Sequence, residues 1–159
     1  MKFIYSLIVA LLFVSGCAEK TRNAKSKFII DFEITKSVDD AVKIIGSNLK
    51  GKNYIITSTF DHEKEAKKLK EMLYPTKTIN LYNSKISTKL ISCNPTMALE
   101  IPFRVAIYSE LNGKTHLTYT DPEYWSLKHN IKDKECLGLL IMLKSDLAEA
   151  TKELQVKSK

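Results

Sequence analysis

The chain is poor in the residues that mark the common catalytic and metal-binding motifs. Its 159 residues include three cysteines, three histidines and five glycines, and no cysteine or histidine pair has the short spacing typical of metal ligands. A glycine-rich phosphate loop, a nucleophile elbow and a paired-cysteine haem attachment motif are all missing. Internal repeats and low-complexity segments are missing too. We therefore expect no metal site and no cofactor.

Arginine is almost absent although the chain is basic. The formal net charge is +7, yet Arg22 and Arg104 are the only arginines and every other basic residue is lysine. Lysine is a hydrated point charge without the bidentate fork of arginine, so scattered lysines are typical of solubility and of attraction to membrane surfaces. We expect no nucleic-acid partner.

Long hydrophobic runs are missing as well. The longest apolar stretch, residues 3–14, follows the basic Lys2 and precedes the small residues Ser15 and Gly16. Twelve residues in a helix reach about 18 Å, which is too short for a hydrocarbon core of roughly 30 Å. This order is typical of a signal peptide rather than of a permanent membrane span.

The end of that stretch predicts a lipid anchor. Val14, Ser15, Gly16 and Cys17 resemble the bacterial lipobox, in which a peptidase cuts just before a lipid-modified cysteine. The resemblance implies a signal peptide over residues 1–16, acylated Cys17 as the bilayer contact, and a cell-envelope protein. Ala18 after the cysteine implies the outer membrane, facing the periplasm, if the cell has two membranes.

The remaining chain divides into a tether and one domain. Residues 17–27 are polar and without apolar period, which predicts a flexible tether. Residues 28–156 have the size of a single domain. Loss of Lys2 with the signal peptide changes the net charge from +7 to +6, so the mature protein stays basic.

Apolar periodicity predicts mixed strands and helices. We expect strands over residues 28–34, 54–60 and 78–82, and helices over 38–49, 61–74, 87–93 and 133–154, with Ser37 and Asp61 as N-caps. In the second helix, Ala66, Leu69 and Leu73 form the expected buried stripe, and Pro75 ends it. Asp121 and Pro122 are expected to begin a short helix that contains Tyr124.

The clearest tertiary signal is a β-hairpin over residues 101–120 around Asn112-Gly113. A two-residue loop makes paired positions sum to 225, so that Tyr108 faces Leu117, Ala106 faces Tyr119 and Arg104 faces Asp121. The alternate face, with Ile101, Phe103, Val105 and Ile107, is expected to be the core side. These elements predict an α+β fold, a two-layer sandwich of an antiparallel sheet with helices on one face.

The order of short motifs from residue 37 to 131 is similar to the domain of unknown function 302 family. The matching pieces are Ser37-Val38-Asp39-Asp40, Phe60-Asp61-His62, Pro75-Thr76, Ile101-Pro102-Phe103-Arg104, Asn112-Gly113-Lys114 and Tyr119-Thr120-Asp121-Pro122. The resemblance implies a β-α-β-rich α+β fold that is frequently dimeric. It implies no settled biochemical activity.

Five residues are candidate ligand-binding residues: His62, Arg104, Tyr108, Tyr119 and Asp121. His62 begins a helix on its apolar side, which suits either a hydrogen-bonded core histidine or a proton-transfer group. An Arg104–Asp121 pair beside Tyr108 and Tyr119 suits either an anionic or aromatic ligand or a structural pair at a dimer face.

Cys93 and Cys136 remain once Cys17 is lipidated. In an oxidising compartment they form either a disulfide or two buried thiols.

Three functional hypotheses follow. The first is a membrane-anchored, non-catalytic binding or interaction module that self-associates, as a homodimer, through the sheet face carrying Arg104. The second is a small envelope enzyme using His62 as acid or base and Arg104 as an anion clamp, although we favour a protein that is not an enzyme. The third is a redox or metal-linked envelope protein using Cys93 and Cys136. The small-molecule ligand is unknown in each case.

Overall fold

A computed structural model describes residues 26–156. The predicted signal peptide, Cys17 and most of the predicted tether lie outside the described residues. Within them, no helix is both long and apolar enough to cross a membrane.

A five-stranded antiparallel sheet organises the domain, in the order β1-β5-β4-β3-β2. The strands are β1 (Ile29–Ile34), β2 (Ile55–Asp61), β3 (Thr76–Tyr82), β4 (Phe103–Ser109) and β5 (Thr115–Thr120). The helices are α1 (Val38–Lys50), α2 (His62–Lys68), α3 (Ser84–Cys93), α4 (Tyr124–Lys128) and α5 (Lys134–Thr151), with short 3-10 turns η2 (Pro95–Leu99) and η3 (Lys152–Leu154). This is the expected α+β fold.

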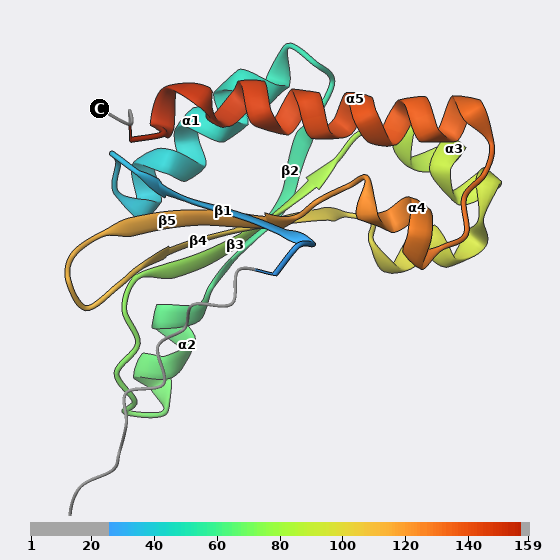
Figure 1. The fold of residues 1–159 in the computed structure, drawn as a ribbon. Coiled ribbons are helices and arrows are strands. Elements are labelled where there is room, and N and C mark those ends of the chain that lie inside the picture. The colour runs from blue at the N-terminus through green and yellow to red at the C-terminus, as the bar shows by residue number, and fades with distance from the viewer. Residues whose placement is uncertain (1–25, 157–159) are drawn as a thin grey trace, which may run out of the picture.

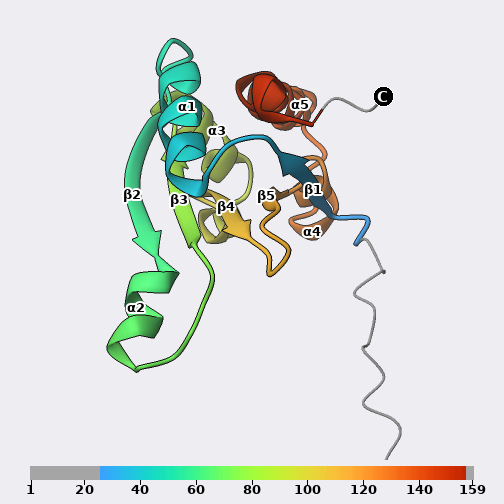
Figure 2. The same ribbon diagram turned by 90° about the vertical axis from the view of Figure 1, so that its left-hand side faces the viewer.

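Helices α1 and α5 form a layer over one face of the sheet, and α2 projects on the opposite side (Figures 1 and 2). Ser37 caps α1 as predicted, since its side chain accepts from the amide of Asp40 at 3.2 Å. The α1 stripe Val38, Ala41, Ile45 and Leu49 is buried. The core lies between this helical layer and the sheet. Phe103, Val105 and Ile107 point into it, so the face of β4 that was predicted to be the core side is buried.

The predicted second helix is wrong in length and in burial. α2 ends at Lys68 instead of continuing to residue 74, because Lys70 adopts a left-handed backbone with φ of 59° and turns the chain away. No α2 residue is buried, and Leu69 and Leu73 are exposed. The pattern of leucines and lysines has high helix propensity, but no element within residues 26–156 buries Leu69 or Leu73.

The predicted hairpin register is wrong by one residue. The loop has three residues, Leu111–Gly113: the Gly113 amide donates to the Glu110 carbonyl at 3.0 Å and the Glu110 amide to the Lys114 carbonyl at 2.8 Å. Gly113 has φ of 79°, which completes a type I turn with a G1 bulge. Paired positions therefore sum to 224, and Val105 faces Tyr119. A one-residue slip moves every side chain of one strand to the other face.

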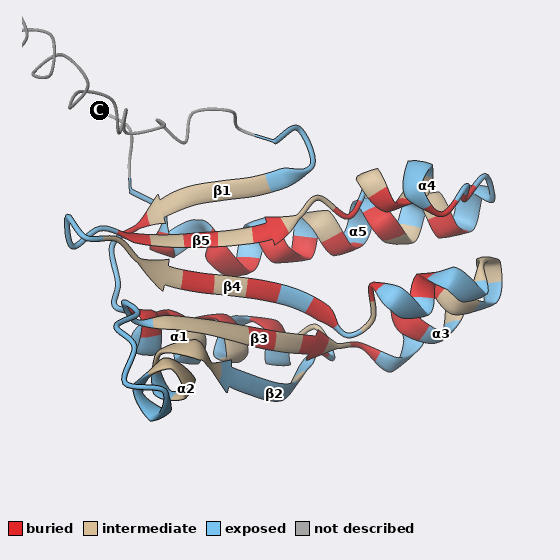
Figure 3. Ribbon diagram, turned by 90° about the horizontal axis from the view of Figure 1, so that it is seen from below, coloured by how far each residue is buried: buried red, intermediate tan, exposed pale blue. Residues whose placement is uncertain are grey.

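The other face of the sheet is not covered by the α1–α5 layer. Seen from below, the strands lie in front of α1 and α5, and most of their residues are half-buried or exposed (Figure 3). We call this surface the open sheet face. Its residues share the side opposite the core and come from all five strands: Ile29, Asp31 and Glu33; Ile55, Ser58 and Phe60; Thr76, Thr78, Asn80 and Tyr82; Arg104, Ala106 and Tyr108; His116, Thr118 and Thr120.

Candidate functional site

His62 lies at one border of the open sheet face. It is the first residue of α2, whose N-cap Asp61 accepts from the Lys64 amide at 2.9 Å, as predicted. Its ring nitrogen Nε2 is 2.9 Å from the Thr78 hydroxyl, and its ring meets that of Phe60 edge-on at 4.8 Å. The ring is half-buried against β2 and β3 rather than inside a helical stripe.

Arg104 lies on the open sheet face but not opposite Asp121. It is exposed and pairs with Asn80 of β3 in the observed register. The predicted Arg104–Asp121 pairing is therefore wrong, because the hairpin loop contains one residue more than the two assumed.

Tyr119 does not belong to the open sheet face. The observed register places it beside Val105 on the core side, where 6% of its surface is exposed. Burial raises the pKa of its phenol above the ordinary value, and the negative charge of Asp121 raises it further. Tyr119 is therefore a core residue instead of the surface ligand contact that was expected.

Tyr108 does lie on the open sheet face, within a cluster that sequence reasoning missed. Its hydroxyl donates to Asp31 at 3.3 Å, and its ring stacks on that of His116 with centroids 5.4 Å apart. His116 is within 3.5 Å of Asp31 and 3.8 Å of Glu110. Neither His116 nitrogen has a hydrogen-bond partner among the described residues, although both atoms are buried. The correct register alone would have paired Tyr108 with His116.

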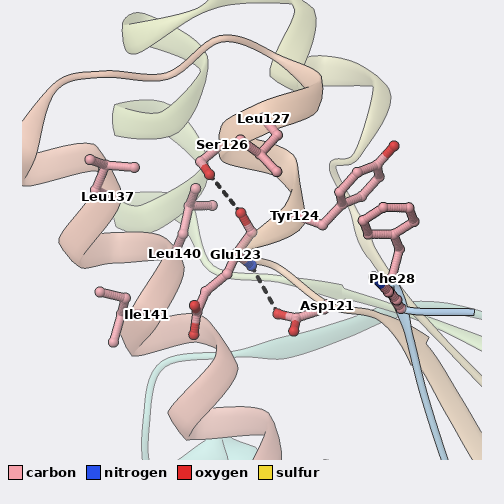
Figure 4. Close-up of a pocket in the computed structure, with 10 residues that line it drawn as sticks. Phe28, Asp121, Glu123, Tyr124, Ser126, Leu127, Leu137, Leu140 and Ile141 are labelled. Atoms are coloured by element: carbon pink, nitrogen blue, oxygen red, sulfur yellow. Dashed lines mark hydrogen bonds between the residues drawn. The ribbon is translucent and has the colours of Figure 1, made fainter.

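Asp121 lies at the other end of the domain, in a pocket between α4, α5 and the start of β1 (Figure 4). The pocket has a volume of about 450 Å³. Phe28 and Tyr124 stack with centroids 3.8 Å apart and form one wall, while Leu137 and Ile141 belong to the opposite helix. These apolar walls suit an apolar group more than a charged one.

The Asp121 carboxylate is already neutralised by a lysine. Lys144 contacts Asp121 at 2.8 Å and Glu123 at 3.1 Å. Its hydrogen bond with Asp121 is the main reason that the pKa of Lys144 is raised. Neither His62 nor Arg104 lines this pocket, so His62, Arg104 and Asp121 do not converge on one cleft.

Cys93 and Cys136 meet where α3 ends and α5 begins. The structure joins them as a disulfide with Cα atoms 6.7 Å apart; Cys136 is fully buried and Cys93 is half-buried. Asp133 lies beside them and accepts from the Cys136 amide at 3.0 Å. Cysteine binds a metal as a thiolate, and a disulfide leaves no thiolate. These three residues therefore cannot hold a metal ion while the disulfide is formed.

A buried polar network links η2 to α4, and no sequence spacing indicated it. The His129 nitrogens lie 2.7 Å from the Thr96 hydroxyl and 3.0 Å from a Glu100 carboxylate oxygen, which also accepts from Lys128 at 2.6 Å. Burial would raise the pKa of Glu100, but the hydrogen bonds from Lys128 and His129 outweigh it and lower the pKa. The three side-chain contacts join residues that are 28 to 33 positions apart in the sequence, so only the fold brings them together.

The family model described as "Domain of unknown function DUF302" matches residues 30–154. The chain belongs to the DUF302 family. A solved DUF302 structure, an uncharacterized conserved protein from Bacillus stearothermophilus, superposes with a TM-score of 0.72 at 14% identity, covering 82% of this chain and 100% of that one. This likeness shows the DUF302 fold alone.

Two longer proteins share part of this DUF302 sequence. Both are named "Fluoride-specific ion channel FluC 1", from Brucella suis biovar 1 (strain 1330) and Brucella abortus biovar 1 (strain 9-941). Each is 25% identical over 103 residues, which is 65% of this chain and 41% or 38% of the relative. The DUF302 chain thus matches less than half the length of these curated relatives.

Proposed function

We propose that this DUF302 protein is a lipid-anchored envelope protein whose domain is a non-catalytic interaction module that self-associates. The anchor rests on the lipobox-like Val14 to Cys17 sequence, and the self-association rests on the open sheet face. The proposed place is the cell envelope, at the outer membrane facing the periplasm in a cell with two membranes.

The open sheet face is the single observation that carries self-association. It has exposed apolar side chains at both edges, Ile29 on β1 and Ile55 and Phe60 on β2, and the small Ala106 near its centre. Aromatic residues and arginine are enriched at protein interfaces relative to the rest of the surface, and this face offers Phe60, Tyr108 and Arg104.

The charges of this face also suit a second copy. Arg104 lies toward one end of the strands, while Glu33 and Glu110 lie at the hairpin end. A two-fold axis that reverses strand direction would bring Arg104 of one copy toward the Tyr108 ring and the acidic end of the other. The contact is then made twice by the same residues, as a symmetric dimer requires.

The geometry does not favour the enzyme hypothesis. An acid–base histidine needs a reacting group and a charge-stabilising group around one cleft. His62 contacts Thr78 and Phe60, and Asp121 is bound by Lys144 at the opposite end of the domain. The proposed role is therefore binding rather than turnover.

The fluoride channel relatives support a role beside a membrane. Their names describe ion channels, and part of each aligns with this chain. A domain that occurs in such chains fits the proposed tether to a bilayer. Channel activity itself is not proposed.

The cysteine pair favours a second candidate, a redox role. Cys93 and Cys136 are joined, and Cys93 is the less buried of the two residues, so a small thiol or a partner thiolate would approach from its side. The buried position of Cys136 also fits a purely structural disulfide.

Sedimentation of the purified mature protein over a concentration series tests the proposal. We expect a dimer whose population rises with concentration. A chain that stays monomeric at high concentration, and that shows turnover abolished by His62→Ala, would replace the interaction module with the enzyme.

A further inference from the structure

Four large apolar side chains stand exposed between α2 and β3, and a fifth, Leu111, stands exposed in the neighbouring β4–β5 hairpin loop. Met72 is 88% exposed, Leu111 82% and Leu69 76%, and Leu73 and Tyr74 are exposed as well. We call these five residues the apolar tip. Apolar residues scattered singly need no explanation, but a cluster of this size marks a contact surface.

The apolar tip is a built surface and not a frayed end. The Leu69 amide donates to the Ala66 carbonyl at 2.9 Å and the Glu71 amide to the same oxygen at 3.0 Å, which fixes the turn after α2. The Ser109 amide donates to the Pro75 carbonyl at 2.9 Å and holds the loop against the β4–β5 hairpin. Leu73, Tyr74 and Leu111 line one hollow of about 700 Å³ between the loop and the hairpin.

The shape of the apolar tip suits a lipid bilayer better than a flat protein partner. α2 and the loop after it project from the sheet on the side away from α1 and α5 (Figure 2). Leu69 and Met72 are the most exposed of the large apolar residues in the loop, and Tyr74 is more covered. In proteins at membrane interfaces, aliphatic side chains enter the acyl region and amphipathic rings lie at the level of the headgroups. The outermost aliphatic side chains of the tip and the more covered tyrosine ring follow the same order.

The charge next to the apolar tip is also complementary to a bilayer. Lys67, Lys68 and Lys70 precede or flank Leu69, and Glu71 is the one acid among residues 67–74. Lys67 and Lys68 are paired with Glu63 and Glu65 one turn earlier, whereas Lys70 makes no ion pair among the described residues. Lys70, next to Leu69, is therefore the lysine placed to attract an anionic headgroup.

We infer that the apolar tip inserts into the surface of a bilayer that contains anionic lipids and so orients the domain on the membrane. This inference rests on the proposed lipid anchor at Cys17 and concerns a single copy on the membrane, because a face-to-face dimer would point its two tips in opposite directions. Eleven residue steps from Cys17 to Phe28 reach at most about 40 Å when extended, which is about the width of a domain of this size. The anchor therefore does not fix how the domain is oriented relative to the bilayer, and insertion of the apolar tip does.

A fluorophore on a single introduced cysteine tests this inference. Cys17 is acylated in the proposed mature protein and Cys93 is bonded to Cys136, so Met72→Cys gives one labelling site. Leu99→Cys is the matched control, because Leu99 is 71% exposed but lies on η2, before β4 and away from the β4–β5 hairpin. The full-length lipoprotein is matured in cells, labelled, and reconstituted into phosphatidylethanolamine–phosphatidylglycerol vesicles with nitroxide-bearing acyl chains.

We expect lipid nitroxides to quench the label at position 72 roughly threefold or more beyond the label at 99, with less quenching in phosphatidylcholine vesicles. Equal quenching at both positions would overturn the inference. A label at position 72 that neither aqueous iodide nor lipid nitroxides quench would overturn it too. In that case a protein partner, and not lipid, covers the apolar tip. If the lipid anchor itself is absent, the protein carries no palmitate label. Vesicles can then be added to this unanchored protein, and quenching of the label at position 72 still tests whether the apolar tip inserts.

Discussion

Replacing Glu100 by glutamine is expected to destabilise the domain by about 2–4 kcal/mol at neutral pH. Glu100 is 7% exposed and accepts from His129, whose side chain is 3% exposed, and from Lys128. A carboxylate only accepts, so His129 Nε2 is the donor in this bond. Glutamine keeps the shape but removes the charge that both donors require.

The magnitude comes mainly from the buried half of the network. A hydrogen bond to a charged group contributes about 1.5–3 kcal/mol, and the contact with Lys128 is discounted because that side chain is 46% exposed. Lys128→Met is therefore the control, with an expected loss below about 1 kcal/mol. Thr96 and His129 remain in place in both variants.

The pH dependence has a definite sign. The folded pKa of Glu100 lies below its ordinary 4.5, so its contribution is complete above that value and is lost as the pH falls through the folded pKa. The difference between wild type and Glu100→Gln should therefore shrink on acidification.

Urea unfolding followed by Trp125 fluorescence measures this effect. Trp125 is 4% exposed and stacks on Phe103, so its emission reports the core. A Glu100→Gln protein within 0.5 kcal/mol (roughly the effect of an ordinary surface substitution) of wild type at pH 7 would refute the reasoning. So would a difference that grows as the pH falls.

Three further outcomes are expected. Cys17→Ala should abolish palmitate labelling and release the protein from membranes; an unchanged distribution would remove the anchor from the proposal. Alkylation without reductant should leave Cys93 and Cys136 unmodified in mass analysis, and two added alkyl groups there would mean free thiols. Gly113→Ala should cost about 1–2 kcal/mol in urea unfolding, because φ of 79° is strained for alanine although no atom blocks its Cβ; an unchanged midpoint would contradict the bulged loop.

Much of the fold could be predicted from local signals. Ser37 and the stripe from Val38 to Leu49 define α1, because capping and period 3.6 agree. Asn112-Gly113 correctly indicates a hairpin. What local signals do not specify is whether the loop has two or three residues, since Asn-Gly is compatible with both and only the pairing of whole strands decides.

That single ambiguity accounts for most errors at the candidate site. It moved Tyr119 from the core to the surface and placed Arg104 opposite Asp121. The Glu100–His129 contact was unpredictable for another reason, since no periodicity or motif relates residues of η2 and α4. The expected burial of Leu69 failed because helix propensity does not show whether a partner element exists.

Self-association through the open sheet face is tested most directly by the mass of an Ala106→Arg variant in solution. Ala106 is half-buried on that face between Thr78 and Thr118, so an arginine there can point to solvent in a monomer but blocks a face-to-face contact. Ser92→Arg, on the exposed side of α3, is the matched control. We predict a dimer mass by light scattering for wild type and Ser92→Arg, and a monomer mass for Ala106→Arg with unchanged unfolding. A monomeric wild type, or a dimer that persists in Ala106→Arg, would contradict the proposal.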